Sequence, residues 1–248
     1  LMNSFRWGLD NRIHGTASGT PGKVRVVGKP ELGTVSFVRS DFSFDPRTLE
    51  FRLENGGAQH GMDFDSAGRK FVCSNSHHIQ QVMYEQRYAG ANPNFMPQSP
   101  LVDIPVDGAS APVFRLSPDE AWRVIRTRWR VAKQVSGPVE GGGRPSGYFT
   151  AATGATIYDG HAWPSGYSGD AFIADAGSNL VHRKKLRSDG IKFTAQRPDD
   201  ERDREFLAST DNWFRPVQME VGPDGALYIA DMYREVIEHP WSLPHPPT

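Results

Sequence analysis

The sequence is poor in cysteine, since Cys73 is the only one among 248 residues. It therefore contains no internal disulfide, no Cys-x-x-Cys metal site and no Cys-x-x-Cys-His haem attachment. Cys73 lies in a run that is predicted to be a strand, where we expect it to fill the core as a small apolar residue.

Long apolar runs and an excess of one charge are also missing. No segment approaches the roughly 20 apolar residues that span a membrane, and no leader of basic, apolar and then small residues opens the chain. The net charge of −1 gives no electrostatic reason to expect nucleic acid or an anionic membrane as a partner. Because the chain starts with Leu1 and a repeat begins almost at once, we expect a piece of a longer protein, so the missing leader does not argue against export.

Turn-forming and aromatic residues are plentiful instead. The 25 glycines and 19 prolines, together with 14 Phe, 7 Tyr and 6 Trp, favour short strands joined by many turns. The composition therefore predicts an all-β fold.

The most informative pattern is Pro223–Asp231, a turn signal followed by a strand of alternating apolar residues. Weaker copies surround three further turn positions, and the four positions Asn11, Gly68, Gly169 and Gly225 are spaced by 57, 101 and 56 residues. Repeats of about 40 to 50 residues that each hold several strands are typical of β-propeller blades. The pattern predicts a β-propeller of about four blades or partial blades, with the surplus residues in loops.

The repeat is interrupted within residues 85–149, where five prolines exclude central strands and long helices before residue 113. Ser117, Pro118 and Glu120 then have the spacing of a helix start, which predicts one inserted helix over about 117–135. Its basic residues either dock a partner or electron acceptor, or form the solvated face of a helix packed on its own domain. We expect residues 1–240 to form one partial propeller domain that contains this insertion, and 241–248 to be a proline-rich tail or linker.

Several strings together resemble one family, the membrane-bound dehydrogenase domain family of planctomycetes and verrucomicrobia, which is similar to soluble glucose and sorbosone dehydrogenases. These strings are Phe71–Gln80, Ala111–Arg115, Arg123–Arg130, Asn179–Arg183 and Pro223–Pro240. The resemblance covers nearly the whole chain. It implies a β-propeller, usually six-bladed, in an exported or periplasmic protein, with the missing blades upstream.

The resemblance also implies a function. Better-studied relatives use pyrroloquinoline quinone (PQQ) and calcium to oxidise sugars, and pass electrons to a c-type cytochrome domain. The haem c of such a domain would lie outside this chain, which lacks the attachment motif. The first hypothesis is therefore the propeller portion of an exported quinone-dependent dehydrogenase that acts on a sugar or polyol. The alternative is a non-catalytic propeller module that binds carbohydrate or protein, since a fold does not fix a function.

Candidate site residues follow from the repeat, because the first strand of every blade lines the central channel. The alignment places Asn3, His60 and Val217 at equivalent positions on these strands, with Gln59 and Arg215 at the strand entrances. His60 is the candidate base for a substrate hydroxyl, because a neutral imidazole accepts a proton near neutral pH. Arg215 either binds a quinone or substrate carboxylate or pairs with an acid of a connecting loop; Gln59 and Asn3 are candidate cofactor-binding residues.

Four further residues each have two interpretations. His78 is either a cofactor ligand or a capping histidine that bonds backbone, and Arg234 either contacts the cofactor or forms an internal ion pair. Asp175 and Asp231 occupy the same place in two repeats. They either contribute to a calcium site or close a turn by accepting backbone N–H bonds.

Overall fold

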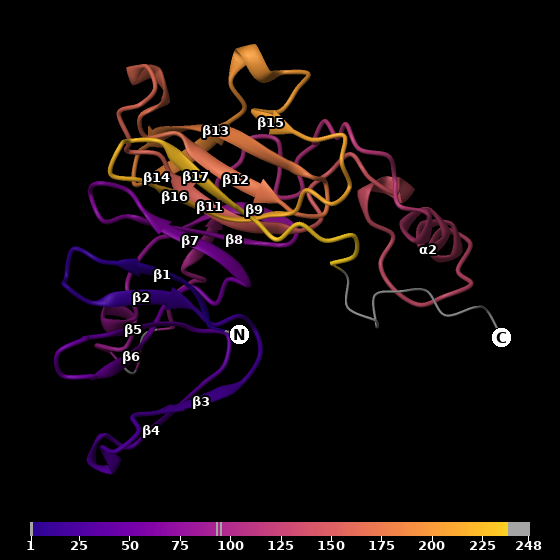
Figure 1. Cartoon of the computed structure of the whole chain (residues 1–248). Helices are drawn as coiled ribbons and strands as arrows, with labels where there is room; N and C mark the ends of the chain where they lie inside the picture. Colours follow the sequence, from indigo (N-terminus) through magenta and orange to yellow (C-terminus); the bar gives the residue numbers. More distant parts are fainter. Residues whose placement is uncertain (1, 93, 95, 238–248) are drawn as a thin grey trace.

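The computed structural model describes residues 2–92, 94 and 96–237, and shows a mostly β protein built from successive antiparallel sheets (Figure 1). The first sheet has the order β1-β2-β5-β6 and the second the order β10-β9-β8-β7. The strands of the first sheet are β1 (Asn3–Trp7), β2 (Ile13–Thr16), β5 (Asp41–Phe44) and β6 (Phe51–Glu54). Those of the second are β7 (His60–Phe64), β8 (Lys70–Ser74), β9 (His77–Val82) and β10 (Leu101–Asp103).

A third sheet of order β11-β12-β13-β14 and a two-stranded sheet β16-β17 complete the series, while β15 pairs with β13 and a hairpin β3-β4 interrupts the first sheet. Their bounds are β3 (Gly22–Arg25), β4 (Thr34–Phe37), β11 (Ala152–Ile157), β12 (Ala171–Asp175), β13 (Leu180–Asp189), β14 (Lys192–Gln196), β15 (Leu207–Ala208), β16 (Pro216–Val221) and β17 (Leu227–Asp231). The helices are α1 (Gln86–Ala89) and α2 (Ala121–Val131), with 3-10 turns η1 (Pro30–Leu32), η2 (Gly141–Gly143), η3 (Ser165–Tyr167) and η4 (Asp199–Glu201). The prediction of a strand-rich chain with one longer helix is confirmed.

Along these four sheets, the strand that comes first in the sequence in each sheet contacts the first strand of the next sheet along the chain. Thus β1 contacts β7, β7 contacts β11, and β11 contacts β16. Each of the four also has a bulge near its start, where the register with the second strand shifts. Bulges recur where a strand must bend or re-aim a side chain. The shared bulge and the shared neighbour order support the repeat that the sequence indicates, although the described part shows no closed ring, and the blade count stays a prediction.

The largest apolar core lies between the second and third sheets, where Phe71, Ile79, Phe149 and Ile173 are buried. Cys73 belongs to it and is fully buried, as expected, with its Sγ donating to the backbone oxygen of His60 over 3.0 Å. Burial raises the pKa of the Cys73 thiol, because the thiolate would lose its hydration. None of the described helices is long and apolar enough to cross a membrane.

The segment that interrupts the repeat contains no central strand, as predicted, but its helix differs from the prediction. Residues 101–103 form β10, so the segment 85–149 contributes the edge strand of the second sheet, a place that its prolines tolerate. Helix α2 begins at Ala121 rather than near Ser117, since Glu120 and not Ser117 precedes its first turn. The Ser117 hydroxyl donates to Asn179 Oδ1 over 2.6 Å and is therefore engaged outside the helix.

Helix α2 also ends earlier than predicted, at Val131, and its faces are not divided as its sequence indicates. Arg123 is buried, whereas Ile125 is 40% exposed. Val236 and Ile237, at the end of the described residues, are in no strand. The tail 241–248 lies outside the described residues.

Candidate functional site

The candidate site is the end of the sheets where the first strands begin, because most of the predicted residues lie there. Asn3 and His60 open β1 and β7, and Asn3 Nδ2 donates to the backbone oxygen of Gln59 over 3.2 Å. The Asn3 side-chain oxygen accepts hydrogen bonds from Ser4 Oγ (2.8 Å) and Thr16 Oγ1 (2.7 Å). The structure therefore brings Asn3, Gln59 and His60 together, and uses the Asn3 carboxamide to join β1 to the entrance of β7.

His60 keeps its imidazole available. The ring is half-buried, and no described residue forms a hydrogen bond with it. Burial lowers the pKa of His60 below its ordinary value, because the charged imidazolium loses hydration there. The side-chain carboxamide of the neighbouring Gln59 is likewise not hydrogen-bonded within the described part of the chain. Near neutral pH the site therefore presents an uncharged proton acceptor at His60 and, on the preceding residue, an amide that is free within the described part of the chain.

Arg215, which precedes β16, is fully buried and has no N–H group left for a ligand. Its Nε donates to Arg234 O, and its Nη1 to Ala176 O (2.9 Å) and Glu120 Oε1 (3.3 Å). Its Nη2 donates to Glu120 Oε1 and Glu235 O. A guanidinium has five N–H donors, so these five contacts use all of them. This arrangement is the one expected of an arginine paired with an acid of a connecting segment, not of a carboxylate receptor.

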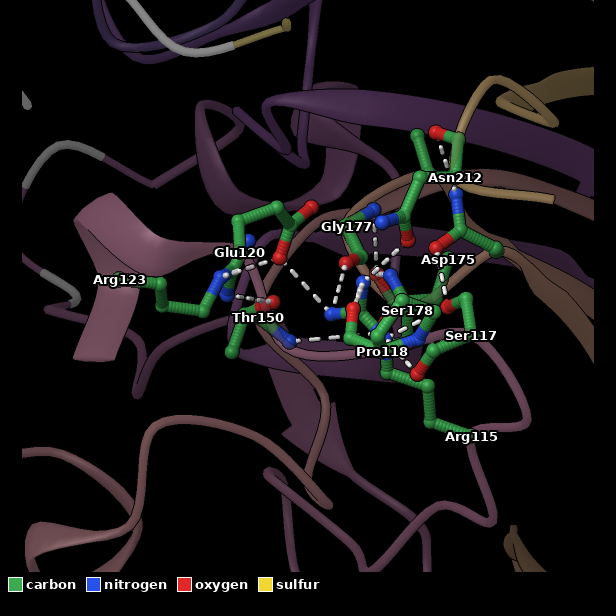
Figure 2. Close-up of polar contacts among 12 residues, drawn as sticks. Arg115, Ser117, Pro118, Glu120, Arg123, Thr150, Asp175, Gly177, Ser178 and Asn212 are labelled. Carbon is green, nitrogen blue, oxygen red and sulfur yellow. Dashed lines mark hydrogen bonds and ion pairs between the residues drawn. The ribbon is translucent and has the colours of Figure 1, made fainter. Parts of the chain in front are cut away.

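The residues around Glu120 form a polar cluster that the sequence does not reveal (Figure 2). Arg115 Nη1 donates to Glu120 Oε2 over 2.9 Å, and Arg123 contacts the same oxygen at 3.4 Å. Burial raises the pKa of Glu120, but the Arg115 hydrogen bond and the Arg123 charge outweigh it, so the net shift is downward. Arg115 also reaches Asn212 Oδ1 at 2.8 Å. The cluster ties the start of α2 to the loops that follow β12 and precede β16.

The two equivalent aspartates close turns. Asp175 is fully buried; its Oδ1 accepts from the backbone N–H of Gly177 (2.9 Å) and Ser178 (3.2 Å), and its Oδ2 from Thr150 (3.3 Å). Asp231 Oδ1 accepts from the N–H of Arg215 (2.7 Å) and Tyr233 (2.9 Å). Both match the turn-closing alternative, in which a carboxylate replaces backbone partners.

His78 and Arg234 differ in how far the fold occupies their side chains. His78 is fully buried, its Nδ1 is 2.6 Å from Ala109 O, and its ring stacks on Phe149 with centroids 4.3 Å apart. Burial, with the nearby His182 and Lys184, lowers the pKa of His78 well below its ordinary value. This is the backbone-bonding alternative. Arg234 is exposed; its backbone accepts from Arg215, and its guanidinium bonds no described residue. Glu238, whose close spacing in the sequence makes it the candidate partner for an ion pair with Arg234, lies outside the described residues.

The first strands also bring together charged residues that the sequence reasoning missed. Arg6 of β1 contacts Asp63 of β7 (Nε to Oδ1, 3.1 Å) and Glu220 of β16, and donates to Met219 O over 2.7 Å. Asp63 Oδ2 also accepts from the N–H of Ile157 in β11. Arg6, Asp63 and Glu220 each lie five positions before a turn residue of the repeat, namely Asn11, Gly68 and Gly225. The alignment of the repeats that indicated His60 therefore also indicates that these three charged residues lie close together.

The geometry decides how well the implied cofactors fit. Gln59, His60 and Arg234 have polar groups free to meet a ligand, and Arg234 is the cation that could meet a carboxylate. The calcium set does not fit, because both oxygens of Asp175 and one of Asp231 already accept backbone bonds. Among the described residues no three His, Cys, Asp or Glu side chains are grouped as a metal site.

The chain is similar to solved structures at low sequence identity. No curated protein matches the sequence. Among solved structures, the chain is similar to a glucose dehydrogenase at 14% identity, with 92% of this chain and 78% of that one covered and a TM-score of 0.38. It is similar to the soluble aldose sugar dehydrogenase of Escherichia coli at 13% identity, with 89% and 75% covered and a TM-score of 0.33.

A family model provides the stronger result. The model described as a domain of unknown function (DUF7133) matches residues 1–247. Because this match extends over nearly the whole sequence, the chain belongs to the DUF7133 family.

Proposed function

We propose that this chain is the propeller portion of an exported, quinone-dependent dehydrogenase that oxidises a sugar or polyol, and that His60 is its proton acceptor. The observation that carries the proposal is the His60 imidazole. It lies at the start of a first strand, its pKa is lowered by burial, and no described residue occupies its ring nitrogens. A histidine that acts as a general base must be unprotonated at the working pH and free to reach the substrate proton.

The reaction needs one proton acceptor and one hydride acceptor. Oxidation of a secondary or aldose hydroxyl breaks the O–H and the adjacent C–H bond and forms a carbonyl. In this proposal the His60 imidazole takes the hydroxyl proton, and the Gln59 carboxamide orients the hydroxyl by a hydrogen bond. PQQ, when bound, supplies the hydride acceptor, and Arg234 is the residue of this chain that would meet one of its carboxylates. No step is assigned to calcium, because Asp175 and Asp231 do not fit it.

The test uses the full-length protein. PQQ and calcium chloride are added, quinone binding is measured by absorbance, and aldoses and polyols are oxidised with an artificial electron acceptor in place of the cytochrome domain. His60→Gln should lower kcat by roughly 10²- to 10⁴-fold, the usual contribution of a general base. His77→Gln, at a 46% exposed histidine on β9, is the matched control and should leave kcat unchanged. Absence of quinone binding, or a His60→Gln variant with the parent kcat, would overturn the proposal.

A second candidate function is a non-catalytic module that binds carbohydrate or protein. It is favoured by the full use of the Arg215 guanidinium and of the Asp175 carboxylate inside the fold, which leaves few charged groups for a cofactor. The same quinone-binding measurement separates the two. A protein that binds a glycan or protein partner but neither binds PQQ nor oxidises any sugar is the module.

A further inference from the structure

A large open cleft lies between the first and second sheets, at the end opposite His60. It has a volume of about 1040 Å³ and is lined by the β1–β2 turn, by β6, by the β7–β8 turn and by the segment from Val82 to Tyr88 that contains α1. Figure 1 shows the two turns on the same side of the molecule and α2 on the other. Pockets for small ligands occupy roughly 300 to 1,000 Å³, so this cleft has room for more than a single sugar ring.

The charges of the cleft are balanced and largely paired. Five Arg or Lys and five Asp or Glu side chains line it. Glu50 receives both Nε and Nη2 of Arg52, at 3.0 and 2.9 Å, and Arg87 pairs with Glu85 at 2.7 Å. A surface with equal numbers of both signs has no preference for a polyanion or a polycation. It does present donors and carboxylate acceptors side by side, which suits hydroxyl groups because each of them both donates and accepts.

Exposed aromatic surface accompanies these polar pairs. Tyr88 is 63% exposed, and the Arg87 guanidinium lies 4.9 Å from its ring centroid. Deeper in the cleft, Phe64 packs edge-to-face on His14 at 5.1 Å, and His14 Nε2 is 3.1 Å from Asp10 Oδ1. Aromatic rings that are bordered by polar groups suit a ligand that has one apolar face and one hydrated edge. The C–H face and the hydroxyl rim of a sugar have this character.

We propose that this cleft binds a neutral oligosaccharide, with Tyr88 stacking on a sugar ring and the Arg52–Glu50 pair meeting vicinal hydroxyls. The balanced charge favours a neutral glycan over an acidic one. The charged side chains that line the cleft together with its tyrosines favour a glycan, which donates and accepts hydrogen bonds, over an apolar peptide. The proposal does not depend on oxidation at His60, since the two sites lie at opposite ends of β7, and either one can fail without the other.

The full-length protein and its variants are tested on a glycan array that carries neutral and acidic oligosaccharides, and the dissociation constant of the best neutral glycan is then measured by calorimetry. Tyr88→Ala and Arg52→Met should each weaken binding at least tenfold. Both residues are exposed, so the fold is expected to persist, and circular dichroism checks this. Tyr228→Ala, at a 58% exposed tyrosine on β17, is the matched control and should bind as the parent does.

Three results would overturn the proposal: no glycan is bound, acidic glycans alone are bound, or neutral glycans are bound equally by the parent and both cleft variants. His60→Gln distinguishes this site from the proposed active site. It should leave the dissociation constant of the glycan unchanged while it lowers kcat for sugar oxidation.

Discussion

Arg215 and Glu120 form a buried ion pair, with Arg215 Nη2 3.3 Å from Glu120 Oε1, although 95 residues separate them. Arg215 immediately precedes β16, the first strand of the fourth sheet in the series. Glu120 immediately precedes helix α2. The pair therefore fixes the inserted helix to the end of the sheets where the candidate site lies. It also explains why this arginine is not available to a ligand.

Arg215→Met should lower the free energy of unfolding by about 3–5 kcal/mol, because Glu120 Oε1 loses both Arg215 donors and the backbone oxygen of Ala176 loses its donor in a buried place. Urea unfolding followed by tryptophan fluorescence measures this. Arg202→Met is the control, since Arg202 pairs with Asp199 where both side chains are more than three-quarters exposed, and its cost should be about 0–1 kcal/mol. If Arg215→Met kept the parent stability and lost only quinone binding, Arg215 would be a cofactor residue after all.

The sequence predicts the order of the strands well, but it does not predict which groups each polar side chain contacts. The Pro223–Asp231 pattern locates β17 and its turn because alternation and turn chemistry are local. Whether Arg215 faces a ligand or a carboxylate depends on the path of residues 85–149, which carry Glu120 to it. No local pattern encodes that path. The same holds for His78, whose Nδ1 partner, Ala109 O, lies in this segment.

Helix α2 shows how tertiary contacts override a local signal. Ser117, Pro118 and Glu120 have the spacing of a capping box, yet the Ser117 hydroxyl bonds Asn179, and the Glu120 carboxylate meets three arginines. Charge-assisted bonds are stronger than a cap bond to a backbone N–H. The helix therefore starts later than its sequence predicts.

Gly61 should be irreplaceable, because it lets two first strands approach each other beside His60. Its φ is +68°, and an added Cβ would lie 2.7 Å from Ala155 N and 2.5 Å from Cys73 Sγ. Gly61→Ala combines backbone strain with overpacking and should cost about 3–5 kcal/mol in unfolding experiments. Gly190→Ala shares the positive φ but meets no atom within 4 Å, so about 1–2 kcal/mol is expected. Equal losses for both variants would refute the close-approach argument.

Asp175 and Asp231 should differ in their effect on stability despite their equivalent places. Asp175→Ala leaves three N–H groups without an acceptor in the core and should cost at least about 3 kcal/mol. Asp231 is exposed, so water replaces its bonds, and Asp231→Ala should cost about 1 kcal/mol. Thermal and urea unfolding of both variants measure the difference. A larger loss for Asp231→Ala would contradict the structural role assigned to Asp175.

Asp63 should make the stability depend on pH. Burial raises its pKa from 3.8 to about 6, against the lowering effect of Arg6. Because the pKa is higher in the folded than in the unfolded state, the stabilising contribution of the protonated form is complete below about pH 4 and is lost as the pH rises through about 6. A shift of about two units corresponds to about 3 kcal/mol.

Asp63→Asn keeps a neutral side chain at every pH, so its stability relative to the parent should rise by about 3 kcal/mol between pH 4 and pH 7. Urea unfolding at several pH values measures this difference. Asp224→Asn is the control, since Asp224 is exposed and its pKa is lowered by the N–H of Ala226 and by Tyr228, away from the range in which Asp63 titrates. Parallel stability curves for the parent and Asp63→Asn would mean that the Arg6–Asp63 pair stays charged from pH 4 to pH 7. The first strands would then be held together by an ion pair over this whole pH range, with no contribution from a protonated Asp63 carboxyl group.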